Sequence, residues 1–239
     1  MSLLPALIIA GPGSNRERDL ALALELAGAD PTVVTASELI DHPRQLRDAR
    51  LVAIAGGFSY GDVLGAGHLL ALDLTVGIGD ELQATVDRGC PVIGVGNGFQ
   101  VLIQMGFLPG GLGRNAHGAF ECRWVAIDAA SSRCVWTTGI EEPIHAPIAH
   151  QRGRYVHPDP ASLADAGQVA FRYRSADPNG SVELIAGVCN AAGNVLGLMP
   201  HPENFVVRRQ HPHASRRRNI TPHSGLRIFE NGVAAGRDI

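Results

Sequence analysis

The sequence predicts an α/β domain with a mostly parallel central sheet and helices on both faces. In the first part of the chain, short apolar runs alternate with amphipathic segments of helical length, as in parallel strands joined by crossover helices. Three of these runs end in glycine-rich turns: GPGSN, GGFSYGD and GVGNGF. Because ligands gather beyond the carboxyl ends of strands in such sheets, the functional site is expected at these turns.

The first elements follow from the apolar runs in chain order. Buried strands are expected at 6–10, 32–35, 51–55 and 91–95. Amphipathic helices are expected over 17–27 and 79–88. Residues 91–106, PVIGVGNGFQVLIQMG, predict a strand, a sharp turn and a further helix.

After residue 106 the pattern changes to strand-like pieces separated by tight-turn signals, which predicts an antiparallel extension. The strand-like pieces are FECRWVAI, VAFRYRS and VELIAGV, and the turn signals are DPNGS and NAAGN. The chain is expected to return to the main sheet at VLGLMPHPE. A basic loop insertion, 207–224, then precedes a last helix near 226–234, all within a single domain of residues 1–239.

The composition is that of an ordinary globular protein, with 45% hydrophobic residues and a net charge of -3. Neither nucleic acid nor a membrane is an expected partner: the basic segment 208–218 lacks interleaved aromatic residues, and no apolar run is long enough to span a bilayer. The four cysteines form no CxxC pair and no metal-like spacing. A reduced, cytoplasmic protein without a metal site is therefore expected.

Gly96 stands at the apex of the turn between the strand and the helix of 91–106, where many enzymes carry a nucleophile. Gly94 and Gly98 provide the clearance that such a tight turn needs. The helix N-terminus lowers the pKa of a thiol and can bind an oxyanion, so the architecture suits a cysteine. Taken alone, the glycine pattern equally fits an anion-binding turn or close packing of a helix.

His201 and Glu203 lie two residues apart near a predicted strand end, between stiffening prolines. Side chains at this spacing in an extended segment share a face, so the carboxylate can orient the imidazole and fix its tautomer. The pair is typical of a general base awaiting a nucleophile, although two neighbouring surface residues would look the same.

Together, motifs between residues 6 and 203 resemble the glutaminase subunits of phosphoribosylformylglycinamidine synthases. These are class I, triad-type glutamine amidotransferases of purine biosynthesis. The motifs are, in order, GPGSN, GGFSYGD, GVGNGFQ, RNAHGAFECRWV, PIAH, DPNGS and GLMPHPE. The resemblance implies a flavodoxin-like fold, a cysteine nucleophile at the position of Gly96, His201 as base and then acid, and Glu203 as its orienting group.

The resemblance also implies that glutamine is the ligand and that backbone N–H groups near Gly57 and at Asn97 form the oxyanion hole. Further substrate or partner contacts are expected at Ser59, Asp62, Gln100 and His150. Ammonia would pass to a large synthetase subunit, which carries ATP and magnesium. A small accessory subunit is a further candidate partner, and no cofactor is expected in this chain.

The chain departs from the family pattern at this site. Gly96 replaces the cysteine, Gly65 replaces a usual arginine, and His150 is followed by Gln151 and Arg152 where the family usually reads HGEG. Two hypotheses remain: a nucleophile-deleted variant of an active glutaminase, or a natural pseudo-glutaminase with a structural or regulatory role. The additional changes favour natural divergence.

Other nucleophiles are poorer candidates. Cys189 lies in GVCN, which spells the elbow motif, but a hairpin turn rather than a helix follows it. Cys90 and Cys122 lie in strand or turn contexts and are interpreted as structural thiols. An unrelated hydrolase that uses Ser14 or Ser59 is a third hypothesis, although neither serine has the elbow geometry.

Overall fold

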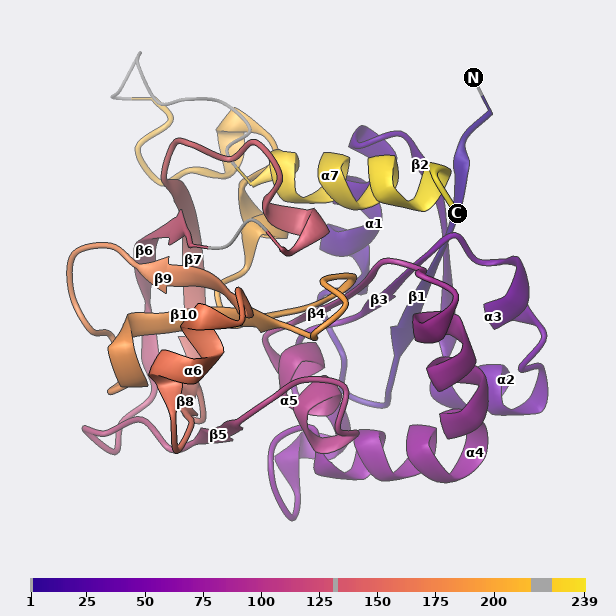
Figure 1. Ribbon diagram of the computed structural model, residues 1–239, viewed down its shortest axis with the longest axis horizontal. Helices are drawn as coiled ribbons and strands as arrows, with labels where there is room; N and C mark the ends of the chain where they lie inside the picture. The colour runs from indigo at the N-terminus through magenta and orange to yellow at the C-terminus, as the bar shows by residue number, and fades with distance from the viewer. Residues whose placement is uncertain (1, 131–132, 216–224) are drawn as a thin grey trace.

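A nine-stranded sheet runs through the described residues in the order β2-β1-β3-β4-β11-β10-β9-β6-β7 (Figure 1). The computed structural model describes residues 2–130, 133–215 and 225–239. The strands from β2 to β11 pair in parallel, and those from β11 to β7 pair antiparallel. The strands of this sheet are β1 (Leu4–Ala10), β2 (Ala29–Thr35), β3 (Leu51–Ile54), β4 (Val92–Val95), β6 (Glu121–Ala129), β7 (Ile144–His150), β9 (Val169–Tyr173), β10 (Ile185–Cys189) and β11 (Val195–Leu198). The predicted parallel sheet with an antiparallel extension is confirmed.

Helices cover both faces of the parallel half (Figure 1). On one face α1 and α7 contribute Leu20, Leu24 and Phe229 to a buried apolar cluster. On the other face the helices α2 to α5 contribute Leu39, Leu70 and others to a second cluster. The helices are α1 (Glu17–Leu26), α2 (Ala36–Asp41), α3 (Gln45–Asp48), α4 (His68–Asp87), α5 (Asn97–Gln104), α6 (Pro160–Asp165) and α7 (Leu226–Arg237). The three-layer arrangement therefore agrees with the sequence.

Smaller elements complete the described fold. β5 (Gly111–Gly113) and β8 (Arg154–Val156) form a separate two-stranded sheet. Short 3₁₀ turns are η1 (Ser59–Asp62), η2 (Val135–Thr137), η3 (Val182–Leu184), η4 (Pro202–Phe205) and η5 (Arg208–Gln210). The predicted basic insertion 207–224 includes η5, whereas its residues 216–224 lie outside the described part of the chain.

Helix α4 is twice as long as the sequence predicted, because it begins at His68 rather than near residue 79. Gly77 and Gly79 interrupt the apolar period, and Ile78 between them has non-helical dihedral angles. Gly77 is nonetheless required by packing: a Cβ there would lie 2.6 Å from a side-chain carbon of Ile40 on α2. Gly77 therefore marks a close approach of α4 to α2 and not a helix end.

The carboxyl ends of the central parallel strands meet at one edge of the sheet. Ile54 of β3 pairs with Gly94 of β4, and Leu198 of β11 pairs with Val95 of β4. The loops that leave these strands consequently lie side by side, as expected for a site of this fold class. They are the loops after β1, β3 and β11 and the single residue Gly96 after β4.

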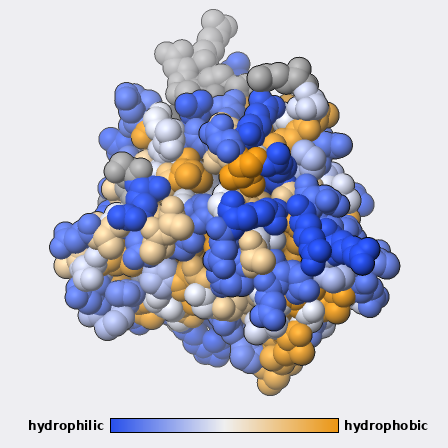
Figure 2. Space-filling model, turned by 45° about the vertical axis from the view of Figure 1, so that its right-hand side comes forward, coloured by the Kyte–Doolittle hydropathy of each residue, from blue (hydrophilic) through white to orange (hydrophobic). Residues whose placement is uncertain are grey.

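The face in Figure 2 is mostly polar, with apolar side chains in several places, one of them its lower tip. Figure 1 places the loop before α4 at that tip, and Val63 and Leu64 in this loop are 59% and 80% exposed. Within the described ranges, no helix combines the length and apolar character needed to cross a membrane.

Candidate functional site

Gly96 forms the sharp turn between β4 and α5. Its φ and ψ are 56° and -108°, a conformation that glycine adopts more readily than other residues. Its amide donates to the carbonyl oxygen of Leu198, 2.8 Å away, which ties the turn to β11. A Cβ on Gly94 would overlap the carbonyl oxygen of Gly98, and a Cβ on Gly98 would overlap that of Ile54. The clearance predicted for these two glycines is therefore needed.

The His201 imidazole points at the apex of this turn. A Cβ on Gly96 would lie 2.7 Å from Cε1 and 2.8 Å from Nε2 of the ring. On its other side, Nδ1 lies 2.6 Å from Oε1 of Glu203. His201 is 7% exposed and Glu203 is fully buried. The structure thus brings together the three residues predicted as nucleophile position, base and orienting carboxylate, in the order that a triad requires.

The amides of Gly57 and Asn97 face the same space. Both residues line one cavity with Gly96, and neither amide donates a hydrogen bond to any described residue. Asn97 is the first residue of α5, so its N–H belongs to the positive end of the helix dipole. Two unpaired donors beside the elbow can hold an oxyanion or a carboxylate.

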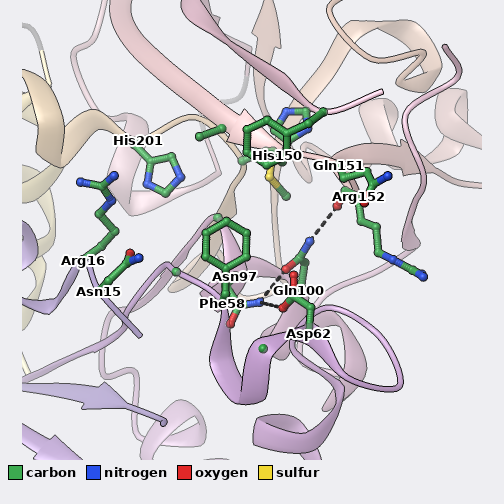
Figure 3. Close-up of a pocket in the computed structure, with 16 residues that line it drawn as sticks. Asn15, Arg16, Phe58, Asp62, Asn97, Gln100, His150, Gln151, Arg152 and His201 are labelled. Atoms are coloured by element: carbon green, nitrogen blue, oxygen red, sulfur yellow. Dashed lines mark hydrogen bonds between the residues drawn. The ribbon is translucent and has the colours of Figure 1, made fainter. Parts of the chain in front are cut away.

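The Asn97 side chain connects the elbow to the loop after β3. Its Oδ1 accepts from the amide and the hydroxyl of Ser59, at 3.2 and 2.5 Å. Its Nδ2 donates to Asp62 at 3.2 Å and to Gln100 at 2.9 Å. Gln100 in turn donates to the backbone oxygen of Arg152 at 2.7 Å (Figure 3). The elbow, the 59–62 turn and the segment after β7 are therefore held in one hydrogen-bonded network.

Two titratable groups beside this network are shifted by their surroundings. Burial raises the pKa of Asp62, and hydrogen bonds from Gly67 and Asn97 and the charge of Arg152 oppose this shift. Burial lowers the pKa of His150 to about 4, and the charge of His201 adds to the effect. His150 is consequently neutral near pH 7. Of the two histidines that line the cavity, His201 is therefore the candidate proton carrier.

The cavity at the elbow has a volume of about 390 Å³. Most of the residues predicted for the site line it, namely Gly57, Asp62, Gly96, Asn97, Gln100, His150 and His201. Glu203 and Ser59 do not line it: Glu203 lies behind His201, and Ser59 is buried beneath Asn97. Their places suit them to hold other side chains rather than to touch a ligand.

Sequence reasoning did not single out several other lining residues, namely Asn15, Arg16, Phe58, Phe120 and Met199. Asn15 ends the GPGSN turn, which was recognised only as a glycine-rich turn. Arg16 follows it and lies beside His201 in Figure 3. Gln151 and Arg152, two of the departures from the family pattern, also line the cavity.

A second cavity of about 290 Å³ adjoins the first, because both are lined by Gln100 and Arg152. Gly65, the third departure from the family pattern, lines this second cavity together with His68 and Gln104. The changed residues thus line two neighbouring cavities.

No cysteine of the described chain lines the elbow cavity. Cys90 and Cys189 are buried, and burial raises the pKa of the Cys90 thiol to about 11. Cys189 ends β10 and is followed by a turn, as predicted. Ser14 accepts a hydrogen bond from the amide of Gly11 and does not line the cavity. Over the described ranges, His, Cys, Asp and Glu side chains form no group able to hold a metal ion.

The family model of the CobB/CobQ-like glutamine amidotransferase domain, GATase_5, matches residues 4–234 of this chain. The chain is 42% identical over 241 residues to the phosphoribosylformylglycinamidine synthase subunit PurQ of Treponema denticola, covering 86% of this chain and 89% of the relative. It is 34% identical over 258 residues to the PurQ subunit of Dehalococcoides mccartyi, covering both chains fully.

Two solved structures have similar folds. A chain in the structure of PurLQS from Thermotoga maritima matches with a TM-score of 0.79 and 38% identity, covering 97% of this chain and 98% of that one. A glutamine amidotransferase from Thermotoga maritima matches with a TM-score of 0.58 at 16% identity, covering 88% of this chain and 80% of that one, and supports the fold alone. The flavodoxin-like amidotransferase fold expected from the resemblance is thereby confirmed.

Proposed function

Because this chain belongs to the family of CobB/CobQ-like glutamine amidotransferase domains, we propose that it is a glutaminase-type subunit of a phosphoribosylformylglycinamidine synthase whose own site no longer hydrolyses glutamine. The relatives named PurQ support the assignment to this subunit type. The observation that carries the loss of activity is Gly96 itself, which faces the His201 imidazole with no side chain.

The proposed loss follows from the chemistry of the site. In a glutaminase of this type a thiolate attacks the side-chain carbonyl of glutamine, amides of the oxyanion hole hold the developing charge, and the base gives its proton to the departing ammonia. Asn97, Gly57 and His201 remain available for the last two roles. The bond-forming sulfur is absent, and loss of a triad nucleophile costs on the order of a millionfold in turnover.

A second candidate function is a natural pseudo-glutaminase that acts as a structural or regulatory subunit of a synthetase fed with free ammonia. The observation that favours it is the place of Gln151 and Arg152, which line the same cavity as Gly96. A single deliberate removal of the nucleophile would leave these neighbours unchanged.

The purified protein is expected to release no ammonia from glutamine above background, and 6-diazo-5-oxo-norleucine is expected not to label it. The reason is the missing thiol at Gly96. Ammonia release is measured with a coupled assay and labelling by intact-protein mass, with the PurQ subunit of Treponema denticola as the positive control. Stoichiometric labelling at Cys189 or Cys90, blocked by excess glutamine, would contradict the proposal.

The protein is also expected to bind a large synthetase subunit, on which ATP and magnesium would act. The similar solved chain comes from PurLQS, which supports a partner of this kind. Ammonia would have to leave the elbow cavity, so the partner should cover its wall at Phe58. The partner should also contact the exposed Val63 and Leu64, which follow in the same loop and the second of which lines the adjoining cavity.

Gel filtration and calorimetry with the synthetase encoded in the same genome test this association. Val63→Asp with Leu64→Asp is expected to weaken it at least about tenfold, because each change buries a charge. Leu3→Asp is the matched control, since Leu3 is also exposed but precedes β1 at the opposite edge of the sheet. A monomer that binds no synthetase from its source would contradict the assignment.

A further inference from the structure

We propose that Cys134 and Cys189 are a redox-active pair, which hydrogen peroxide converts into a reversible disulfide. Both thiols are free in the structure, and each residue is 0% exposed. They come from distant parts of the sequence, because Cys134 directly precedes η2 and Cys189 ends β10. Neither residue lines the elbow cavity, so this modification site is independent of the proposed function.

The two thiols interact with each other in the apolar core. Both belong to the buried cluster on the face that α1 and α7 cover. The Cys189 thiol donates to the carbonyl oxygen of Gly167 at 3.7 Å. The Cys134 thiol is hydrogen-bonded to Cys189, which raises the pKa of Cys134 and lowers that of Cys189. Two such thiols can reach the bonding distance of about 2 Å by side-chain rotation, provided that their backbones lie close together.

Hydrogen bonds hold the backbone around Cys134 against the turn that follows Cys189. The amide of Val135 donates to the carbonyl oxygen of Gly193 in this turn, at 2.9 Å. The guanidinium of Arg133 donates to a carbonyl oxygen of the same turn, also at 2.9 Å. A Cβ on Gly193 would overlap the carbonyl oxygen of Arg133, so glycine permits this close approach. Both neighbours of Cys134 are thus fixed to the segment that begins at Cys189.

The other two cysteines differ from this pair. Cys122 on β6 is exposed. Cys90 is buried, but its thiol lies 3.8 Å from the carbonyl oxygens of Ala49 and Pro91. Over the described ranges, no hydrogen bond joins the thiol of Cys90 or Cys122 to another thiol. The chain therefore offers a buried thiol outside the pair as an internal comparison.

The oxidation begins at Cys189. The hydrogen bond from Cys134 lowers the pKa of Cys189 against the effect of burial, and the charge of Arg133 adds to this shift. The Cys189 thiolate attacks hydrogen peroxide and becomes a sulfenic acid, while the departing hydroxide takes up a proton and leaves as water. The Cys134 sulfur then attacks the sulfenic sulfur, and its proton leaves with the hydroxyl group as a second water. One peroxide thus accepts two electrons from the two thiols, and an added dithiol reverses the reaction by exchange.

The disulfide would tie the end of β10 to the segment that holds α7. Asn231 on α7 donates to the carbonyl oxygens of Trp136 and Thr138, at 3.0 and 2.8 Å. The Trp136 indole donates to the carbonyl oxygen of Asn194 at 3.0 Å, in the turn after β10. A covalent link beside these contacts would close the chain between residues 134 and 189 and restrict the unfolded state. Oxidation is therefore expected to raise Tm by at least about 5 °C, as measured by circular dichroism.

Mass spectrometry of the full chain after peroxide treatment tests the proposal. Free thiols are blocked with N-ethylmaleimide, and the chain is digested without reductant. A disulfide-linked pair of peptides containing Cys134 and Cys189 is expected, lighter by about 2 Da than the two reduced peptides together. Dithiothreitol is expected to release the two peptides and to return Tm to its starting value. This measurement needs no variant.

Cys134→Ala is expected to abolish both the linked peptides and the rise in Tm on oxidation. The matched control is Cys90→Ala, which also removes a buried thiol but leaves the pair intact. A native chain whose Cys134 and Cys189 are both still blocked by N-ethylmaleimide after peroxide treatment and denaturation would overturn the inference. A disulfide that joins Cys189 to Cys90 or Cys122 instead would overturn it as well.

Discussion

Gly96→Cys is expected to turn over glutamine at least about a thousandfold faster than the parent chain when the synthetase subunit is present. The substitution supplies the one group that the triad geometry lacks, because His201, Glu203 and the two amides are already placed around it. The helix N-terminus and the imidazole both favour the thiolate. The initial rate of ammonia release at saturating glutamine measures the effect.

The new side chain has a structural cost. Its Cβ would lie 2.7 and 2.8 Å from atoms of the His201 ring, which must therefore shift while Glu203 holds its other edge. The positive φ of 56° adds strain that glycine avoids. We expect the free energy of unfolding to fall by about 1–2 kcal/mol, measured by denaturant titration.

The double variant Gly96→Cys with His201→Ala should lose the gained activity, since the thiol then has no base.

The turnover restored in Gly96→Cys should require high glutamine concentrations, because Arg152 and Gln151 still line the cavity. Adding Gln151→Gly and Arg152→Glu, the usual family residues, is expected to lower KM more than it changes kcat. If Gly96→Cys folds, binds its partner and shows no activity even with these two changes, the triad positions assigned here are wrong.

Gly98→Ala is expected to lower the free energy of unfolding by about 3 kcal/mol or more. The added Cβ would overlap the carbonyl oxygen of Ile54, so α5 would have to move away from β3. Backbone atoms of a central strand cannot yield as the end of a flexible side chain can. Chemical denaturation followed by circular dichroism measures the change.

Gly79→Ala is the matched control, since Gly79 also lies within a helix but a Cβ there meets only ordinary contacts, the nearest at 3.9 Å. Alanine is the better helix former, so this variant should gain about 0.5–1 kcal/mol. If both variants lost the same free energy of unfolding, replacing a helical glycine would itself be destabilising. The close approach of α5 to β3 would then not explain the effect of Gly98→Ala.

The parallel half of the fold was predictable because its strands are buried on both faces and so appear as short apolar runs between turns. The same rule missed β7, whose sequence IHAPIAH carries a proline and two histidines. It also missed α2, which is six residues long and too short to show a helical period. What the sequence does show there is the capping pair Thr35 and Glu38, whose two hydrogen bonds start the helix.

The elbow and the His201–Glu203 pair were predictable because each is a local pattern of two to five residues. The cavity around them was not, since its wall comes from six separate stretches of the chain. Ser59 illustrates the difference: its motif indicates the site, but only the fold shows that its hydroxyl donates to Asn97 rather than facing the cavity. No motif indicated that Arg16 lines the cavity; the sequence shows only that it follows GPGSN.

The position of β11 has a consequence for the order of folding during synthesis. This strand is the last of the sheet to leave the ribosome, yet it lies between β4 and β10. Until Val195–Leu198 emerge, β4 has an unpaired edge, and the antiparallel strands have no parallel sheet to join. Such edges are templates for association with other chains. The nascent chain is therefore most exposed to misassembly just before β11 is complete, and chaperone protection should matter most at that length.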